Sequence, residues 1–475
     1  MEKHTFNSSD LTFLKNKQYK TKFVKHRPSF YPSITLCDYS FKKKGPEEDR
    51  LYEKFPFLID LVRRGNTYLY SENENKITLV RKGLQKFFDL DKSYIEENLK
   101  IPEKERVKRS RIYSSKIKHI IFDEAEKCEN AIKIYKSEKV NGENCQIAYN
   151  SNFKLWLISS KNVCLCARNK DDLNFYEEIN DVRYDYSLLF ARKWFEILIN
   201  MEHKGIDLKQ FKKEMENKCL IGEYCGNLDY QHLIMYDEIN IRFFAIVDLE
   251  DCRSCIPPSK SIEFFEKYKL CMARFKDCGV SYNFYELNDK LYKIYDQTFI
   301  SNAVEEGEGN VLYFVELDGK GEEKAVLSLC KIKTFEYRAL RKLREKLRAF
   351  SRFRTDHENK YKILKAYEKE LYDLVSNCES DEAYKRIEEY RDLAKYAFSV
   401  IEAHFITSGE IYYHFSSLLT FLLYNKRNKL KITDESFTNH KFMNVVKNMK
   451  WIDFFEEDCK SRKSTNIEEF EEIKE

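Results

Sequence analysis

The sequence is poor in glycine and proline and contains no long apolar run. Its 475 residues include 13 Gly and 7 Pro, against 32 Tyr and 35 Phe. This composition excludes low-complexity tracts and flexible Gly-rich linkers. No stretch reaches the roughly 20 apolar residues that span a bilayer, and no secretory signal follows Met1. We therefore expect a cytoplasmic protein without a membrane partner, with a nuclear or organellar location left open.

The chain also lacks a strong net charge of either sign. It carries 83 Lys and Arg against 79 Asp and Glu, a formal net charge of +4. Domains that bind nucleic acid through their overall charge are usually far more basic. Any contact with nucleic acid must therefore come from local basic segments.

No disulfide framework is visible among the 14 cysteines, which are scattered and favour a reducing compartment. The nearest approach to a metal-binding pattern is Cys252-Arg-Ser-Cys255, followed by Cys271 and Cys278. Structural zinc sites usually repeat a regular Cys pair, and here the second pair is irregularly spaced. The pattern favours free thiols over zinc.

The chain is organised around the segment Ser137–Cys145, which contains Lys139 and the pair Asn141-Gly142. The preceding residues 131–139 (AIKIYKSEK) and the following 145–150 and 153–159 alternate as strands do. Asn-Gly is typical of a tight turn with positive φ. We therefore expect Lys139 at the end of a strand. An ordinary solvated turn lysine would show the same local pattern.

Upstream of this segment, residues 63–90 predict strand, polar turn and strand, and carry Arg64 and Lys86 among aromatic residues. A plain hairpin with solvated cations is the alternative. Residues 1–50 are basic, and we expect them to be irregular. Residues 104–118 form a second basic run.

Downstream of Lys139, the pattern predicts further strands that carry chemically useful side chains. Lys161 follows a strand, Glu223 lies in residues 219–227, and residues 241–249 form a buried strand by composition. Helical spacing predicts helices over 186–201, 261–275 and 290–304. Residues 305–311 (EEGEGNV) lead into a strand, and residues 325–333 (AVLSLCKIK) form the strand that returns.

The last third of the chain has helical periodicity. Residues 334–354 form an amphipathic helix, and residues 331–354 contain ten Lys or Arg against two Glu. Such a charge run is most often a solvated face. Because this excess is larger than the net charge of the whole chain, we expect the helix to face a polyanion. Further helical patterns fill residues 360–450.

Five of these elements occur in an order that resembles the covalent nucleotidyltransferases, a group of RNA ligases, DNA ligases and mRNA-capping enzymes. They are the basic hairpin, Lys139-x-Asn-Gly, the strand glutamate Glu223, Glu308-Gly-Asn-Val, and Lys331-Ile-Lys333. Within the group, residues 60–340 are most similar to phage-type RNA ligases and to the ligase domain of tRNA ligases. The Lys86-Phe-Phe element matches the region that phage ligases carry ahead of the nucleophile.

The resemblance implies a role for each matching residue. Lys139 would be the nucleophile that takes AMP from ATP, and Lys331 and Lys333 would complete the catalytic set. Glu223 and Glu308 would hold Mg²⁺ or Mn²⁺, which prefer carboxylate and phosphate oxygens. For the second acid, Glu306 offers an alternative register, and we choose Glu308 because it leads directly into the strand. The residues that would bind the nucleotide are Glu138, Asn141, Gly142, Arg64, Lys86, Phe88 and Lys161, together with the same Glu223 and Glu308. One of Phe243 and Phe244 would be the aromatic that stacks on adenine.

The expected architecture is α+β: a nucleotidyltransferase domain with antiparallel sheets, resembling the ATP-grasp-like ligases, and a C-terminal all-helical domain. We place the N-terminal part of the ligase domain at 1–120, the adenylyltransferase core at 121–355 and the helical domain at 356–475. The alternatives to an RNA ligase are an mRNA-capping guanylyltransferase, a DNA ligase, or a non-catalytic RNA-binding protein on the same fold. The tail shows no β-barrel pattern typical of the first two.

Two absent motifs bear on the substrate. The sequence contains no G-x-x-x-x-G-K-[ST] segment and no paired His-x-Thr elements, so kinase and cyclic-phosphodiesterase halves are missing. The chain should therefore seal RNA ends that already carry 5′-phosphate and 3′-hydroxyl. We expect it to act as a monomer, with its protein partners unassigned.

Overall fold

A computed structural model describes residues 16–42, 46–55, 58–71, 76–90, 131–226, 232–234, 236, 238–250, 254–300, 307–352, 357–375, 381–404, 408 and 411. The chain forms two compact units. The first comprises residues 1–225, 238–296 and 310–332, and the second comprises residues 226–237, 297–309 and 333–475. The second basic run, residues 104–118, lies outside the described residues.

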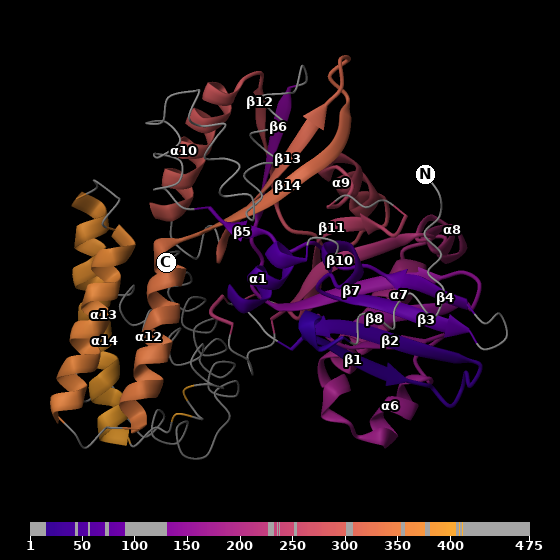
Figure 1. The fold of residues 1–475 in the computed structure, drawn as a ribbon, viewed down its shortest axis with the longest axis horizontal. Coiled ribbons are helices and arrows are strands. Elements are labelled where there is room, and N and C mark those ends of the chain that lie inside the picture. Colours follow the sequence, from indigo (N-terminus) through magenta and orange to yellow (C-terminus); the bar gives the residue numbers. More distant parts are fainter. Residues whose placement is uncertain are drawn as a thin grey trace, which may run out of the picture. The chain divides into compact units, whose positions relative to one another are not determined.

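The first unit begins with a four-stranded sheet in the order β1-β2-β3-β4 (Figure 1). Its strands are antiparallel: β1 Thr21–His26, β2 Ile34–Phe41, β3 Asn66–Ser71 and β4 Lys76–Arg81. The 3-10 turn η2 Lys17–Tyr19 precedes it, and the helices α1 Pro46–Lys54 and α2 Leu58–Leu61 lie between β2 and β3. The expectation that residues 1–50 are irregular is therefore wrong for β1, β2 and α1. In β1 each lysine is next to an apolar residue, so the short strand has no long apolar run and looks in sequence like part of a basic tail.

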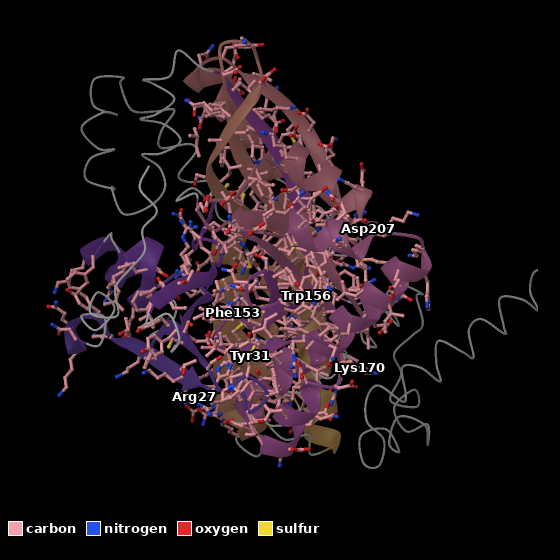
Figure 2. The ribbon with its side chains drawn as sticks, turned by 90° about the vertical axis from the view of Figure 1, so that its right-hand side faces the viewer. Arg27, Tyr31, Phe153, Trp156, Lys170 and Asp207 are labelled. Carbon is pink, nitrogen blue, oxygen red and sulfur yellow. The ribbon has the colours of Figure 1, made fainter. Side chains whose placement is uncertain are left out.

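A five-stranded sheet in the order β11-β10-β7-β8-β9 carries the main core of the first unit. Its strands are β7 Glu143–Asn150, β8 Leu155–Ser159, β9 Cys164–Ala167, β10 Lys218–Cys225 and β11 Asn240–Asp248. The helices α6 Leu173–Ile179, α7 Asp185–His203 and α8 Leu208–Glu214, with η3 Val182–Tyr184, contribute to the same core. Trp156 of β8 packs edge-on against Trp194 of α7, with 5.1 Å between ring centroids. Figure 2 shows Trp156 among the crowded side chains of this unit, and the rings of Tyr31 and Phe153 meet edge-on with 5.8 Å between centroids.

The third sheet has the order β12-β6-β13-β14-β5. Its strands are β5 Phe88–Asp89, β6 Ile132–Glu138, β12 Phe275–Ser281, β13 Gly309–Leu317 and β14 Glu323–Lys333. Strand β6 lies between β12 and β13, antiparallel to both, and β14 pairs with β5 in parallel. The helices α9 Pro258–Lys267 and α10 Phe284–Ile300 flank β12 in sequence. The inner strand β6 is the one that leads to Lys139.

The helices α12 Phe335–Arg352, α13 His357–Val375 and α14 Asp381–His404 pack together in the second unit (Figure 1). Phe350 of α12 meets Phe398 of α14 edge-on at 4.6 Å, and the Tyr367 hydroxyl of α13 donates to the Ala339 carbonyl oxygen. The predicted apolar face of α12 therefore packs against the C-terminal helices. No described helix is both long and apolar enough to cross a membrane.

The expected α+β class, with antiparallel sheets followed by a helical region, is confirmed by these elements. One predicted helix is too long: the spacing predicts a helix over 261–275, but α9 ends at Lys267. Lys269 then adopts a left-handed conformation with φ of 51°, which ends the helix. The chain turns back so that the Phe243 amide donates to the Cys271 carbonyl oxygen. The apolar residues after Lys269 are thus buried beside a strand.

Candidate active site

Lys139 lies directly after the end of β6, as the sequence predicts, and is half-buried. Its neighbour Glu138 is opposite Asn310 in the pairing of β6 with β13. Glu138 is also bound twice by Arg274, whose carbonyl oxygen accepts from the Glu138 amide and whose Nε lies 2.9 Å from the Glu138 carboxylate. The backbone that presents Lys139 is therefore fixed from both sides of the strand.

The turn after Lys139 contacts the predicted acid of β10. The Gly142 amide donates to Oε2 of Glu223 at 2.7 Å, although the two residues are 81 positions apart. Asn141 beside it is buried, with 4% of its surface exposed. The expectation of a positive φ at Asn141-Gly142 is wrong, because neither residue adopts one. Position 142 has room only for glycine, because an added Cβ would lie 2.4 Å from the Tyr224 carbonyl oxygen.

Glu223 is half-buried on β10, opposite Asn144 of β7. One of its oxygens accepts from Gly142, and a carboxylate has further lone pairs for a cation. This donor type suits Mg²⁺, which takes one or two protein carboxylates and completes its shell with phosphate oxygens and water. Across the described residues, no three His, Cys, Asp or Glu side chains are grouped to hold a metal by themselves.

The cysteine pattern predicts free thiols. Cys255, Cys271 and Cys278 are free, and Cys252 lies outside the described residues. Burial raises the pKa of the Cys255 thiol to about 12, so this sulfur is protonated near neutral pH.

The predicted cations Arg64, Lys86 and Lys161 gather around one carboxylate, that of Glu48 on α1. Arg64 donates to both Glu48 oxygens, from Nε at 3.1 Å and from Nη2 at 2.9 Å. Lys86 Nζ lies 3.8 Å from Oε2 of Glu48, and the charge of Lys161 acts on the same group. Sequence reasoning missed Glu48, because nothing in Gly-Pro-Glu-Glu-Asp indicates which cation a helical glutamate will meet.

The protonation of Glu48 reflects this surrounding charge. Burial by itself raises the pKa of the carboxyl, but the hydrogen bonds and charge of Arg64, with the charges of Lys161 and Lys86, outweigh it. The net result is a pKa below the ordinary value of 4.5. Glu48 is thus an anion at neutral pH. A cavity of only about 20 Å³ remains beside it, lined in part by Arg64, Lys161 and Asn162.

Lys331 occupies a half-buried position near the end of β14. Its Nζ lies 3.4 Å from the Phe87 carbonyl oxygen and 3.9 Å from a carboxylate oxygen of Asp89. Phe88 lies between those residues, on β5, where it is opposite Cys330. The segment that includes Lys86 is therefore attached to the β14 strand through β5.

Lys333 and Glu308 belong to the second unit and bind each other. Lys333 Nζ lies 3.3 Å from Oε1 of Glu308, and their side chains are only 13% and 6% exposed. The Thr334 amide donates to the Glu308 carbonyl oxygen at 3.2 Å, which fixes the backbone of the pair. The alternative acid, Glu306, lies outside the described residues.

The structure separates the two aromatic candidates on β11. Phe243 is fully buried and stacks on Phe265 of α9, with 5.8 Å between centroids, while Trp194 meets it edge-on. Phe244 is skipped in the register between β10 and β11, where Gly222 is opposite Phe243 and Ile221 is opposite Ala245. This β-bulge leaves Phe244 outside the core that holds Phe243, with 9% of its surface exposed.

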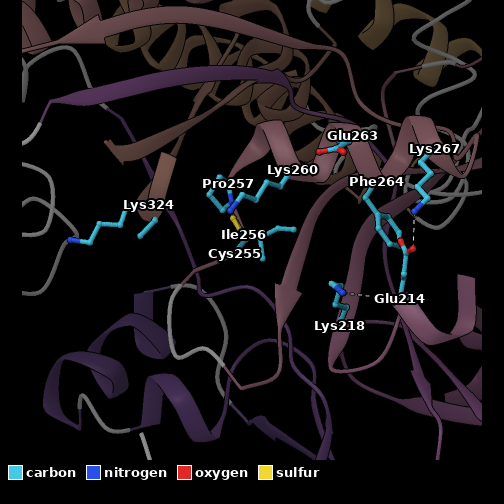
Figure 3. Close-up of a pocket in the computed structure, with 11 residues that line it drawn as sticks. Glu214, Lys218, Cys255, Ile256, Pro257, Lys260, Glu263, Phe264, Lys267 and Lys324 are labelled. Atoms are coloured by element: carbon cyan, nitrogen blue, oxygen red, sulfur yellow. Dashed lines mark hydrogen bonds and ion pairs between the residues drawn. The ribbon is translucent and has the colours of Figure 1, made fainter. Parts of the chain in front are cut away.

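A separate cavity of about 510 Å³ in the first unit contains none of the predicted site residues (Figure 3). Two of the lysines that line it are engaged: Lys267 Nζ binds the Glu214 carboxylate at 2.7 Å, and Lys218 Nζ donates to the Glu214 carbonyl oxygen. Its apolar lining includes Cys255, Ile256, Pro257 and Phe264.

No protein-family model and no curated protein matches the chain. Among solved structures it is similar to an archaeal ATP-dependent RNA ligase in form 2, with a TM-score of 0.44 and 16% identity, covering 83% of this chain and 78% of that one. Form 1 of the archaeal enzyme gives a TM-score of 0.43 and 15% identity, with coverage of 83% and 77%. A Naegleria gruberi RNA ligase with PPi gives a TM-score of 0.29 and 13% identity, with coverage of 67% and 96%. The structural neighbours named here are RNA ligases, the family that the sequence motifs resemble.

Proposed function

We propose that this chain is an ATP-dependent RNA ligase that joins 5′-phosphate and 3′-hydroxyl ends through a lysyl-AMP intermediate on Lys139. The observation that carries the proposal is the hydrogen bond from the Gly142 amide to the Glu223 carboxylate. It joins the turn that follows the predicted nucleophile to the strand of the predicted acid. Two motifs that are far apart in sequence thus meet within one unit, as a shared nucleotide site requires.

In the first step, the neutral amine of Lys139 attacks the α-phosphorus of ATP. A nitrogen–phosphorus bond forms, the bond to the bridging oxygen breaks, and pyrophosphate leaves. An oxygen of an RNA 5′-phosphate then displaces the lysine and takes the AMP. Finally, an RNA 3′-hydroxyl attacks that 5′-phosphate, forms the phosphodiester and releases AMP. A lysine amine is a nucleophile only when deprotonated, and cations close to it favour that state.

The other predicted residues receive roles that fit their chemistry. Lys331 and Lys333 would neutralise charge on the α-phosphate as the nitrogen–phosphorus bond forms. The cations around Glu48 would meet the outer phosphates of ATP. Phe244 is the better candidate for stacking on adenine, because Phe243 is enclosed in the core. Glu138, Asn141, Gly142 and Phe88 would shape the nucleotide site.

Glu223 and Glu308 are the residues that would hold Mg²⁺ or Mn²⁺. A bound divalent ion would supply positive charge to the phosphate oxygens at the reacting centre. Some Naegleria gruberi RNA ligase structures are described with ATP and Mn, which makes Mn²⁺ a useful second ion in the assays.

The first test is covalent labelling with ATP carrying a radioactive α-phosphate, in the presence of Mg²⁺ or Mn²⁺. We expect the wild-type chain to retain label after denaturing electrophoresis and Lys139→Ala to retain none. Lys136→Ala is the matched control, because Lys136 lies on the same strand three residues earlier. Its labelling should equal that of the wild type. Absence of label on the wild type, or equal label on Lys139→Ala, would exclude the proposed mechanism.

The same assay separates the alternatives. Labelling with GTP in preference to ATP would indicate a capping guanylyltransferase. Sealing of nicked duplex DNA in preference to RNA with 5′-phosphate and 3′-hydroxyl ends would indicate a DNA ligase. RNA binding without any covalent adduct would indicate a non-catalytic protein. We expect an ATP-specific adduct followed by RNA sealing.

A further inference from the structure

Glu48 is a buried anion at the centre of the cations assigned to the outer phosphates of ATP. Its side chain is 5% exposed, and both of its oxygens accept from Arg64 in the two-bond arrangement that guanidinium and phosphate groups also form. Lys86 lies within 3.8 Å of the same carboxylate, and Lys161 contributes its charge. The carboxylate therefore occupies the position that a phosphate would take on Arg64.

The space around this cluster agrees with that description. The cavity beside Glu48 measures about 20 Å³, which is room for about one water molecule and less than a phosphate group needs. A phosphate group cannot enter it while Glu48 stays on Arg64. Three cations against one carboxylate still leave the cluster with two positive charges. An anion is thus attracted to the cluster, but the internal carboxylate competes with it.

The helix that carries Glu48 is itself held in place. On α1, the Tyr52 hydroxyl donates to the Val62 carbonyl oxygen at 2.7 Å, and the Tyr52 ring meets Phe41 of β2 edge-on at 5.0 Å. Glu48 lies one helical turn before Tyr52, on the same side of the helix. The contact between Glu48 and Arg64 is therefore part of a packed arrangement of α1 against β2 and the segment before β3.

We propose that Glu48 is an internal counter-ion that competes with the outer phosphates of ATP for Arg64, Lys86 and Lys161, and so keeps the affinity for pyrophosphate low. The inference rests on the proposed function, in which pyrophosphate leaves after each adenylylation. Pyrophosphate that stays bound can reverse the first step. A carboxylate that returns to Arg64 displaces the product, so Glu48 acts as a positioning residue that promotes pyrophosphate release.

The test compares the binding of inorganic pyrophosphate to the wild type and to Glu48→Gln by isothermal titration calorimetry. Glutamine keeps the shape of the side chain and removes its charge. Because a unit charge a few ångströms from each cation is lost, we expect pyrophosphate to bind at least about tenfold more tightly. We also expect pyrophosphate to inhibit Lys139 labelling at a correspondingly lower concentration. Glu47→Gln is the matched control on the same helix; Glu47 is exposed, and its variant should bind pyrophosphate as the wild type does.

Each outcome decides the inference. A folded Glu48→Gln protein that binds pyrophosphate no more tightly than the wild type overturns it. If Glu48→Gln does not fold, Glu48→Asp replaces it: the shorter carboxylate loosens the contact with Arg64, so tighter pyrophosphate binding than the wild type is expected and unchanged binding overturns the inference. A wild type that takes label from ATP, with unchanged affinity in the variants, leaves the ligase proposal intact. A wild type that neither binds pyrophosphate nor takes label overturns both.

Discussion

At Gly142 the backbone of β10 comes so close that a single methyl group has no room. An added Cβ would lie 2.4 Å from the Tyr224 carbonyl oxygen and 2.8 Å from Sγ of Cys225. Gly142→Ala must therefore push the turn away from β10 and stretch the 2.7 Å hydrogen bond to Glu223. Overpacking of this kind costs about 1–3 kcal/mol. We expect a lower thermal midpoint and strongly reduced labelling of Lys139.

Gly319→Ala provides the control for that experiment, because nothing lies within 4 Å of a Cβ at Gly319 and its φ is not positive. The thermal midpoint and the Lys139 labelling of this variant should equal those of the wild type. Wild-type labelling by Gly142→Ala would show that the close approach to β10 has no part in presenting Lys139.

The buried histidine of β1 gives a pH dependence with a definite sign. Both ring nitrogens of His26 are shielded from solvent and lack a hydrogen-bond partner, although the residue as a whole is half-buried. Burial lowers the pKa of His26 below its ordinary 6.5, against the attraction of Asp38 and together with the charge of Arg183. The imidazole is therefore neutral in the folded protein and takes up a proton more readily once unfolded.

Because the unfolded state binds more protons at mildly acidic pH, this contribution is fully present above pH 6.5 and is lost as the pH falls toward the folded pKa. We expect the thermal midpoint to drop between pH 7.5 and pH 5.5, and to drop less in His26→Phe, which cannot take up the proton. The buried carboxyl of Glu48, with its lowered pKa, titrates below this window. Identical pH profiles for the two proteins would contradict the prediction.

At single residues, the sequence could predict the chemistry of a side chain but not its partner. The sequence pattern placed Lys139 at the end of a strand and Glu223 within one, as the structure has them, and their catalytic roles stay predictions. The role of Glu48 was not predictable, because its partners Arg64, Lys86 and Lys161 come from three separate segments that meet only in the fold. The choice between Phe243 and Phe244 depends on a β-bulge, which the apolar run of β11 does not reveal.

At the scale of elements, long periodic segments are predictable from the sequence and sheet edges are not. The helices over 186–201 and 334–354 correspond to α7 and α12, whose apolar faces are wide and continuous. Strand β1 escapes prediction because only one of its six residues is buried, so its short alternation carries little apolar signal. Residues 271–275 resemble a helix in sequence because Met272, which forms a bridge to Phe243, follows the same apolar spacing as a helix face.

A buried ion pair ties the first two sheets together. Arg81 of β4 binds Asp38 of β2 at 3.2 Å, with side chains 0% and 1% exposed, and also donates to Oε1 of Gln146 of β7 at 2.7 Å. Asp38 accepts in addition from the Cys164 amide of β9. Asp38 and Arg81 together thus join strands β2, β4, β7 and β9. Removing one member leaves a buried charge without its partner.

Asp38→Ala should therefore lower the free energy of unfolding of the first unit by about 3–5 kcal/mol, measured by urea denaturation. The matched control is Lys362→Ala, which removes an ion pair with Glu358 whose side chains are 64% and 77% exposed. That change should cost less than about 0.5 kcal/mol. A loss for Asp38→Ala as small as that of the control would mean that the ion pair contributes little to the junction of the sheets.

Across the whole molecule, positive charge is concentrated far more locally than the net charge of +4 suggests. Part of the excess on α12 is balanced inside the second unit, because Lys342 and Lys346 both bind Glu370 of α13. Arg341 is exposed, and Arg338 and Arg348 are half-buried on the same helix. The apolar face of α12 is covered by α13 and α14, so these three arginines are our candidates for binding a polyanion.

Replacing Arg338, Arg341 and Arg348 together by Gln should leave labelling of Lys139 by ATP nearly unchanged, since none of them belongs to the proposed nucleotide site. Sealing of RNA should weaken, because arginines that bind phosphates hold the strand without reading its bases. The slope of log affinity against log salt concentration should flatten by roughly one unit for each RNA phosphate that the variant no longer binds. The measurement is RNA binding and sealing across a salt series. A triple variant that matches the wild type at every salt concentration would make this side of α12 an ordinary solvated surface, and the RNA would have to run elsewhere.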